Sequence, residues 1–339
     1  MQDFKNNRRK RIGPVREMGT FVAILLCIVL LLSQLAVRLV KEDGDLLLEG
    51  DKSIAGIQGE PKDTIDVLVV GDSESYTTVS PMQLWKEQGV PSYVCGQPGQ
   101  EIQQSYYMLK TALKTQSPKV VLLETNVIYR YKGRASGLQL ILDEMRSYYF
   151  PIFRFHDIWK PLLTGQRYPQ VKYKGFQIRT GVKAYQGGAY MEETTKKKEI
   201  EKLNLYYMDK IIKLCQDKGA ELLLYSGPSP INYDSAKHNG LAELAKKRGL
   251  SYLDLNMKLT ELGIDWKTDT LDKGDHLNLS GAEKVTQYLG EYLTRVYELR
   301  DRRKEPGYES WHTEAERFEG ETIPQLWQIR GDAGEDGKE

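Results

Sequence analysis

Short apolar runs alternate with longer amphipathic stretches through the middle of the chain. The runs predict five buried strands, at 65–70, 92–95, 119–124, 221–226 and 251–255. The stretches have helical spacing and predict helices at 81–88, 101–115, 196–218, 235–247 and 280–299. Strands that alternate with helices are typical of βαβ units, in which helices cover both faces of a parallel sheet. The predicted fold class is therefore α/β, a flavodoxin-like three-layer sandwich with a five-stranded parallel sheet.

A different apolar pattern marks the N-terminal region. The run from Gly19 to Val37 is about as long as the ~20 residues that cross a hydrocarbon core, and Gln34 is its only strongly polar member. Basic residues precede this run and acidic residues follow it, so we expect residues 1–18 in the cytoplasm. We predict one transmembrane helix at 19–40, in a single-pass protein of the cell membrane with its main domain extracytoplasmic.

A cleaved signal peptide is the alternative for this N-terminal region. The apolar run is longer than the apolar core of a usual signal peptide, and no clean small-x-small cleavage site follows it. These two features favour an uncleaved membrane helix.

The rest of the chain divides by composition. The polar, Gly-rich segment 41–61 predicts a linker, and the strand and helix alternation places the main domain at 62–299. An aromatic, Gly-rich insertion at 127–195 interrupts the alternation and is expected to form the wall or lid of a pocket. The highly charged segment 300–339 predicts a mostly disordered tail, with a docking stretch near 323–329.

Composition and charge narrow the function classes. The 339 residues are 40% hydrophobic, enough for a sizeable core, and the formal net charge of +1 gives no reason to expect a nucleic-acid partner. The spacing of Cys27, Cys95 and Cys215 suggests neither a disulfide framework nor a zinc site. Buried free thiols are favoured, while a Cys95–Cys215 bridge stays open. We expect no cofactor and no metal ion.

The first predicted strand ends on Gly71-Asp72-Ser73. Strands of open parallel sheets present functional residues at their carboxyl ends, so the hydroxyl of Ser73 is a candidate nucleophile. The glycines Gly96 and Gly99 follow the second strand, where they could direct a backbone N–H at a developing oxyanion. Asn126 follows the third strand and could supply a further donor. Taken alone, Gly-Pro clusters are mostly turns, and an asparagine just past a strand is far more often simple turn chemistry.

A histidine near the C-terminal end completes the constellation. His276 precedes a helix whose start is marked by Asn278 or Ser280, and Asp272 and Asp275 are available to orient its ring. A lone histidine is more often structural than catalytic. The conjunction of a serine, oxyanion-type donors and an Asp/His pair at strand ends of one sheet predicts a catalytic site.

These residues resemble the four signature blocks of the SGNH/GDSL hydrolase superfamily, over about 62–299. The stretches "GDSESYTT" and "GDHLNLSGAEK" are similar to its membrane-anchored, extracytoplasmic branch, which includes D-alanine transfer proteins and envelope O-acyltransferases. Two blocks depart from the family pattern. The third reads Glu124-Thr125-Asn126-Val127 where the family has Gly-x-Asn-Asp, and Lys273 occupies the acid position of the usual Asp-x-x-His.

The resemblance implies serine acyl chemistry. Ser73 would attack an ester or thioester carbonyl, His276 would take its proton, and an aspartate would hold the imidazole. The N–H of Ser73, the N–H of Gly99 or Gly96 and the side chain of Asn126 would stabilise the oxyanion. Water as acceptor gives an esterase or deacetylase, and a sugar or polyol hydroxyl gives an O-acyltransferase.

The same resemblance implies an envelope polysaccharide, peptidoglycan or teichoic acid as substrate, and a membrane-bound O-acyltransferase as partner. A non-catalytic, membrane-tethered polysaccharide-binding or assembly module with the same fold is the alternative, because the acid position is altered.

The identity of the acid is a separate prediction. Asp272 could fold back toward the imidazole if Lys273-Gly274 bends tightly, and Gly274 makes such a bend inexpensive. We therefore expect Asp272 to orient His276 and Asp275 to make capping or loop hydrogen bonds, with a Ser-His pair lacking an acid as the remaining alternative.

Overall fold

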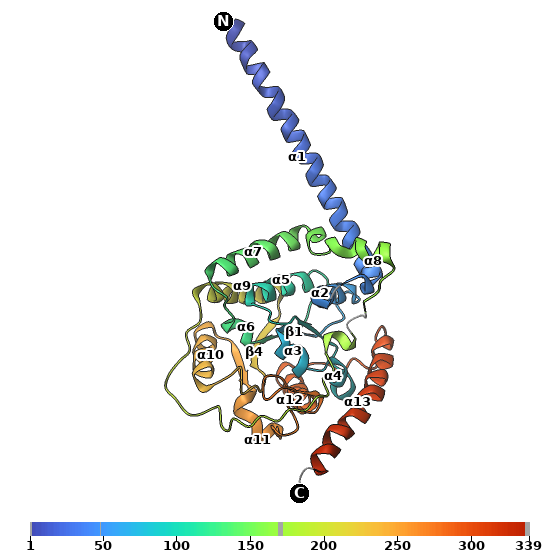
Figure 1. The fold of residues 1–339 in the computed structure, drawn as a ribbon, viewed down its shortest axis with the longest axis vertical. Coiled ribbons are helices and arrows are strands. Elements are labelled where there is room, and N and C mark those ends of the chain that lie inside the picture. The colour runs from blue at the N-terminus through green and yellow to red at the C-terminus, as the bar shows by residue number, and fades with distance from the viewer. Residues whose placement is uncertain (1, 48, 169–171, 336–339) are drawn as a thin grey trace.

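A computed structural model of the chain describes residues 2–47, 49–168 and 172–335 (Figure 1). Its centre is a five-stranded parallel sheet with the order β2-β1-β3-β4-β5, which confirms the predicted fold class. The strands are β1 (Val67–Gly71), β2 (Ser92–Gly96), β3 (Val120–Glu124), β4 (Glu221–Ser226) and β5 (Ser251–Asp254). Each lies within two residues of its predicted bounds, because β1 to β4 are short and mostly buried apolar runs; β5 is buried only at its end.

The alternation of side chains along β1 divides the core into two layers. Leu68 and Val70 face the layer that contains α5 (Ile102–Ala112), α9 (Lys202–Lys218) and α10 (Ser235–Arg248). Val67 and Val69 face the layer that contains α4 (Pro81–Gln88) and α12 (Leu279–Tyr297). Successive residues of a strand point to opposite faces, so a continuous apolar run serves a sheet that is buried on both sides.

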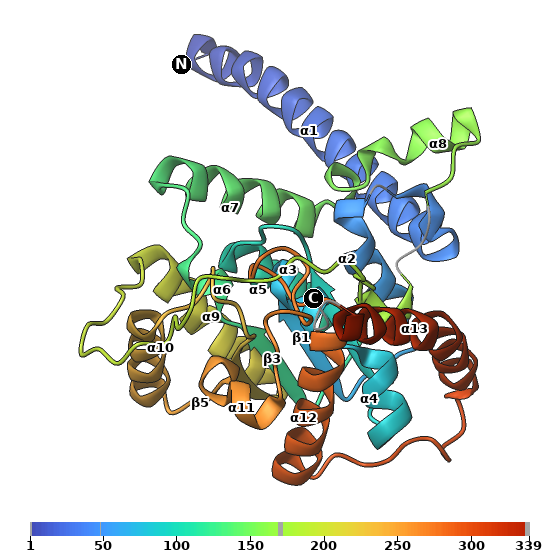
Figure 2. The ribbon, with the colours of Figure 1, turned by 60° about the horizontal axis from the view of Figure 1, so that its bottom comes forward.

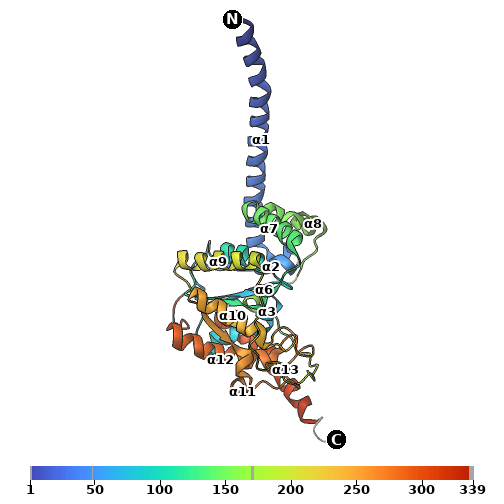
Figure 3. The same cartoon turned by 90° about the vertical axis from the view of Figure 1, so that its left-hand side faces the viewer.

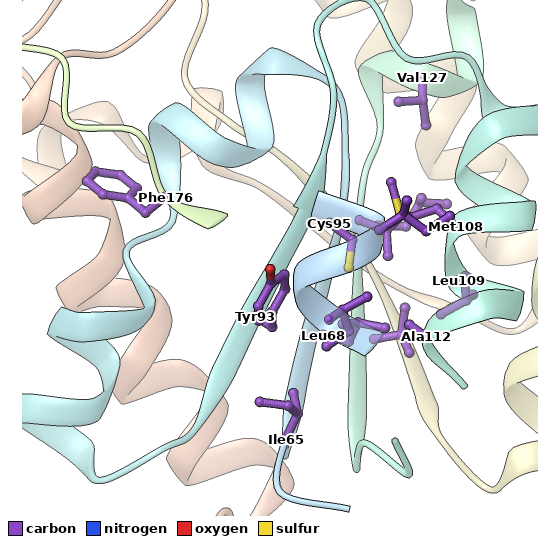
Figure 4. Close-up of a cluster of buried hydrophobic side chains, with 14 of the residues drawn as sticks. Ile65, Leu68, Tyr93, Cys95, Met108, Leu109, Ala112, Val127 and Phe176 are labelled. Carbon is purple, nitrogen blue, oxygen red and sulfur yellow. The ribbon is translucent and has the colours of Figure 1, made fainter. Parts of the chain in front are cut away.

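Figure 4 shows part of the first layer. Leu68 of β1 and Cys95 of β2 lie beside Met108, Leu109 and Ala112 of α5, and all five are buried. Both Cys95 and Cys215 are buried free thiols, so no bridge joins them. The thiol of Cys95 packs as a small apolar side chain.

The remaining helical elements lie mostly outside the predicted set. They are α1 (Gln2–Glu42), η1 (Gly44–Leu46), α2 (Glu49–Gly59), α3 (Ser73–Thr78), α6 (Asn126–Tyr129), α7 (Arg134–Tyr149), η2 (Pro151–Phe153), η3 (His156–Ile158), α8 (Trp159–Thr164), η4 (Tyr173–Gly175), η5 (Leu255–Lys258), α11 (Leu259–Leu262) and α13 (Glu309–Glu335). Several of them are one or two turns long, too short for a helical period to stand out in the sequence.

Helix α1 projects from the sheet domain (Figure 3). Within the described residues, its part from Val15 to Glu42 is the one helix long and apolar enough to cross a membrane. The segment 41–61 differs from the expected linker, because η1 and α2 fold against the domain and bury Ile54 and Ile57. Its few apolar residues lie on the side of α2 that packs against the domain, a pattern that the surrounding glycines and charges obscure.

The insertion 127–195 has two parts, apart from 169–171, which lie outside the described residues. Its first part contains α7 and α8. Its second part belongs to an extended segment, residues 176–201, which we call the strap and which lies beside the loop that carries His276. The strap is held by backbone hydrogen bonds from Lys183 N to Thr270 O (3.1 Å) and from Tyr185 N to Trp266 O (3.0 Å). The helix expected from residue 196 begins at Lys202 instead, since Lys198 N still bonds to Ala236 O (2.8 Å) in the extended strap.

The expectation of a mostly disordered tail at 300–339 is wrong for residues 309–335, which form α13; residues 336–339 lie outside the described residues. Trp311 packs on Trp85 of α4 with ring centroids 5.4 Å apart, and Phe318 packs on Tyr173 at 5.0 Å. The residues of α13 that lie against the domain recur at helical spacing: Trp311, Ala315, Phe318, Thr322, Leu326 and Ile329. Their burial stabilises a helix that its high charge alone does not predict.

Candidate active site

Ser73 is the first residue of α3, directly after the carboxyl end of β1. The preceding Asp72 caps α3, because its side chain accepts a hydrogen bond from Glu74 N (3.0 Å). A β-carbon at Gly71 would lie 2.5 Å from the β-carbon of Glu124, so only glycine allows β1 and β3 to approach here. The hydroxyl of Ser73 is half-buried, and its backbone N–H has no partner within the helix.

The structure brings Ser73, His276 and Asp272 into one chain of contacts. The Oγ of Ser73 lies 2.8 Å from Nε2 of His276, and Nδ1 of His276 lies 2.8 Å from Oδ2 of Asp272. The other carboxylate oxygen of Asp272 accepts a hydrogen bond from the backbone N–H of His276 (2.7 Å). The His276 side chain is 19% exposed, so the ring is held in place and still open to a substrate.

The loop before His276 has the tight bend that this contact requires. Lys273 and Gly274 both adopt positive φ, 64° and 90°. The bend is supported from two sides: Gly274 N donates to Thr270 Oγ1 (2.7 Å), and Lys273 N donates to the strap at Lys183 O (2.8 Å). The bend turns Asp272 back toward the imidazole, as the sequence argument expects; that Asp272 acts in catalysis stays a prediction.

Asp275 lies in a different set of contacts. Its Oδ1 accepts a hydrogen bond from Nδ2 of Asn232 (2.7 Å), whereas its Oδ2 is 3.7 Å from Nδ1 of His276. The N-cap of α12 is Asn278, whose side chain accepts hydrogen bonds from Ser280 N and Gly281 N. Asp275 therefore makes the loop hydrogen bonds that we expected, and it does not cap the helix.

The expected oxyanion donors have different surroundings. Gly96 is packed against α3, since a β-carbon there would lie 2.5 Å from Ser75 Oγ. Gly99 adopts φ 62°, and no other described heavy atom lies within 4 Å of a β-carbon built on it. The side chain of Asn126 donates to Oδ2 of Asp72 (3.0 Å), which uses one of its two N–H bonds. Their roles toward an oxyanion stay predictions.

A cluster of buried carboxyl groups, which the sequence did not predict, lies next to Ser73. Asp72, Glu74 and Glu124 are fully buried, and the guanidinium of Arg130 pairs with Asp72. Glu124 accepts hydrogen bonds from the backbone N–H of Asn126 (3.0 Å) and from the hydroxyl of Tyr233. The available signal was a carboxylate at or just past the end of a buried strand, in "GDSE" and in "LLET".

Burial sets the protonation of this cluster. It raises the pKa of Glu74 well above the usual range, and the neighbouring Asp72 and Glu124 add to the effect. The pKa of Glu124 is raised well above its usual range by burial and then by Asp72. Both shifts favour the neutral, protonated form of these carboxyl groups, so burial lowers the negative charge that the cluster would otherwise carry.

One group of side chains has the composition of a metal site. Glu74, Asp275 and His276 offer ligand atoms that lie within 4.8 Å of one another. Both ring nitrogens of His276 are already in contact with Ser73 and Asp272. The donor set fits the proton-transfer chain better than a metal ion.

No protein-family model matches the chain, and no curated protein matches it. Among solved structures, it is similar to a GDSL-like lipase from Bacteroides thetaiotaomicron VPI-5482, with 10% identity over 73% of this chain and 98% of that chain and a TM-score of 0.40. It is also similar to an acetyl xylan esterase from the rumen bacterium Butyrivibrio proteoclasticus, with 9% identity over 70% of this chain and 65% of that chain and a TM-score of 0.32. Both likenesses are distant, and the function is inferred from the site itself.

Proposed function

We propose that the chain is a membrane-anchored, extracytoplasmic serine esterase or O-acyltransferase that acts on an envelope polymer. The observation that carries the proposal is the contact of Ser73 Oγ with His276 Nε2, and of His276 Nδ1 with Asp272, each at 2.8 Å. A nucleophile, a base and an orienting acid in series are the arrangement that serine acyl transfer requires.

The geometry supports a two-step reaction. In the first step, Ser73 Oγ bonds to the acyl carbon and its proton passes to Nε2 of His276, which then gives it to the departing alkoxide or thiolate. In the second step, His276 takes a proton from water or from an acceptor hydroxyl, whose oxygen bonds to the acyl carbon; the bond to Ser73 Oγ breaks, and the imidazolium returns the proton to Oγ. Asp272 keeps the proton of the neutral ring on Nδ1 and stabilises the imidazolium.

The proposed polymer and the proposed partner are supported by features of the sequence. The resemblance of the four blocks to the SGNH/GDSL hydrolases, together with the apolar length of α1, supports an acyl ester of an envelope polysaccharide, peptidoglycan or teichoic acid. In the transfer reading, a membrane-bound O-acyltransferase supplies the acyl group. The assembled Ser-His-Asp contacts favour catalysis over the non-catalytic binding module.

A serine-directed fluorophosphonate probe tests the catalytic proposal. We expect the probe to label the full chain in detergent, and Ser73→Ala to abolish both the labelling and the hydrolysis of an activated acetyl ester. Ser235→Ala, at the start of α10, is the matched control and should keep both. Equal labelling of wild type and Ser73→Ala would reject Ser73 as the nucleophile.

Hydrolysis and transfer are separated by the product. The wild-type protein is given an activated acetyl ester with and without an envelope oligosaccharide, and the sugar is examined by mass spectrometry. An acetylated oligosaccharide that Ser73→Ala fails to form indicates transfer, whereas acetate as the only product indicates an esterase.

A further inference from the structure

Helix α7 carries a row of apolar side chains that the described part of the chain leaves exposed. Leu138, Leu142, Met145 and Tyr149 are 49%, 55%, 39% and 56% exposed. Their spacing of four, three and four residues places them along one side of the helix. The side of α7 that packs on the domain is different, since Gly137 lies against Leu203.

The following segment continues this apolar surface. Phe153 is 40% exposed, and Trp159, Leu162 and Leu163 of α8 are 54%, 48% and 78% exposed. We call the whole surface the apolar platform, and its members are Leu138, Leu142, Met145, Tyr149, Phe153, Trp159, Leu162 and Leu163. Exposed apolar side chains that gather on successive elements in this way indicate an interaction site.

The platform lies beside the base of α1 (Figure 2). The backbone N–H of Ile152, between α7 and α8, donates to Ser33 Oγ of α1 (3.3 Å). Tyr149 and Pro151 line a cavity of about 560 Å³ together with Leu30 and Val37 of α1. Of the row on α7, Tyr149 therefore lies next to α1, and the rest of the row leads away from that contact along α7.

The depth of this contact follows from helix geometry. The candidate span ends at Glu42, nine residues after Ser33, and a rise of about 1.5 Å per residue puts Ser33 roughly 13 Å back along the helix. A span of this length covers about the 40–45 Å of a bilayer with its headgroups. When α1 crosses the bilayer, the Ser33–Ile152 contact therefore lies at or below the headgroup region.

Charge and aromatic side chains near this contact suit the same environment. Lys110 and Lys114 lie over the ring of Tyr148 at 4.4 and 3.9 Å, and Arg38 and Lys41 line the cavity beside α1. Tyrosine and tryptophan are enriched at membrane interfaces, and lysine and arginine attract the phosphates of anionic lipids.

We propose that the apolar platform is embedded in the outer-leaflet interface of the membrane that α1 crosses. The inference rests on the membrane anchor of the proposed function and adds a second attachment to it. Helix α7 packs on α5, which covers one face of the sheet (Figure 1). That face is then turned toward the lipid, and the carboxyl edge with Ser73 opens sideways along the membrane surface.

Depth-dependent fluorescence of the full chain in lipid vesicles tests the platform. The chain is reconstituted in phosphatidylcholine with a minority of phosphatidylglycerol, and an NBD fluorophore is attached to single cysteines. The variants are Leu142→Cys and Leu163→Cys on a Cys27→Ala background, because Cys95 and Cys215 are buried. Met257→Cys is the matched control for Leu142→Cys, since Met257 is 58% exposed, close to the 55% of Leu142, but lies on η5.

We expect the labels at 142 and 163 to emit at shorter wavelength than the label at 257. Spin-labelled lipids should quench both, at a depth of about 5–10 Å, and should leave the label at 257 unquenched. The melting temperatures of the variants should match that of wild type, which shows that the labels report on intact domains.

A label on the native Cys27 separates the two proposals. If lipid quenches Cys27 while positions 142 and 163 behave like 257, the span is correct and the platform is overturned. If positions 142 and 163 are shielded in native membranes but not in these vesicles, a protein covers the surface and lipid is rejected as its occupant. If Cys27 itself is unquenched, α1 does not span, and both the anchor and the platform fail.

Discussion

The two carboxylates beside His276 occupy different positions. Asp272 contacts Nδ1 at 2.8 Å and also binds the backbone of His276, so it holds both the ring and the loop. Asp275 instead shares Asn232 with Glu74, whose Oε1 accepts from the same amide at 2.6 Å. Asp275, next to the histidine, is thus linked to the buried cluster through Asn232, whereas Asp272, four positions before the histidine, contacts the imidazole.

This difference predicts unequal effects of two isosteric substitutions. Asp272→Asn should lower kcat for an activated ester by about 10³–10⁴-fold, because the amide favours the wrong imidazole tautomer. Asp275→Asn should mainly lower the melting temperature. Steady-state kinetics and thermal melts of both variants provide the measurement, and a large loss of rate confined to Asp275→Asn would reverse the assignment.

The buried Glu74 predicts a pH dependence of stability. Its folded pKa lies well above the unfolded value, so the native state binds the extra proton and stability falls as pH rises from the unfolded pKa of about 4.3 toward the folded one. Glu74→Gln removes this titration and keeps an acceptor for Asn232. The melting temperature of Glu74→Gln relative to wild type should therefore increase between about pH 5 and pH 8.

Glu193→Gln is the control for that comparison, because Glu193 is exposed on the strap. Its melting temperature relative to wild type should stay constant over the same range. A difference for Glu74→Gln that is also constant with pH would mean that Glu74 does not titrate in this way.

At the scale of elements, α13 shows how a charged segment is ordered by a few aromatic contacts. The ring of Trp311 contacts those of Trp85 and Tyr308, which also stack on each other, and Trp311 is 2% exposed. Trp327 lies on the same helix and is 76% exposed. The two tryptophans therefore form a matched pair in which burial is the main difference.

Trp311→Ala should lower the free energy of unfolding by about 3–5 kcal/mol, because it removes a large buried ring and leaves a cavity against α4. Trp327→Ala should change it by less than about 0.5 kcal/mol. Urea unfolding of the full chain in detergent measures both values. Equal effects of the two substitutions would show that α13 does not pack on the domain.

At the scale of the whole molecule, the expected topology places the sheet domain outside the cell membrane. The basic cluster lies before the apolar run of α1, and the sheet domain lies after that run. We expect protease added to intact cells to remove the domain, because the basic side of a span stays in the cytoplasm. A domain that survives in intact cells and is cut only after permeabilisation would show the reverse orientation.

Much of the domain could be predicted because its signals are local. A buried parallel strand needs only four to six consecutive apolar residues and a turn, and β4 agrees with its predicted bounds at both ends. The helices α4 and α10 were predictable for the same reason, since a serine or aspartate caps each start and a glycine in the left-handed region ends each helix. Ser73 was identifiable because it directly follows such a strand, and His276 because it lies shortly before the capped start of α12.

Other features depend on residues that are distant in the sequence. Glu124 accepts a hydrogen bond from Tyr233, 109 residues later, and the side chain of Asn126 donates to Asp72, 54 residues earlier. Helix α13 is stable because α4 offers Trp85, more than 200 residues earlier. None of these partners is visible in a local window of sequence.

The sequence by itself determined the parallel sheet, the order of its strand-end residues and the apolar length of α1, because periodicity, turn residues and run length are properties of neighbouring residues. Only the tertiary structure decided that Asp272 contacts His276, that Glu74 and Glu124 are buried near Ser73, and that η2, which follows α7, contacts α1. These outcomes depend on where packing places segments that are far apart in the chain, and burial and contact with an opposite or like charge then set what each side chain can do.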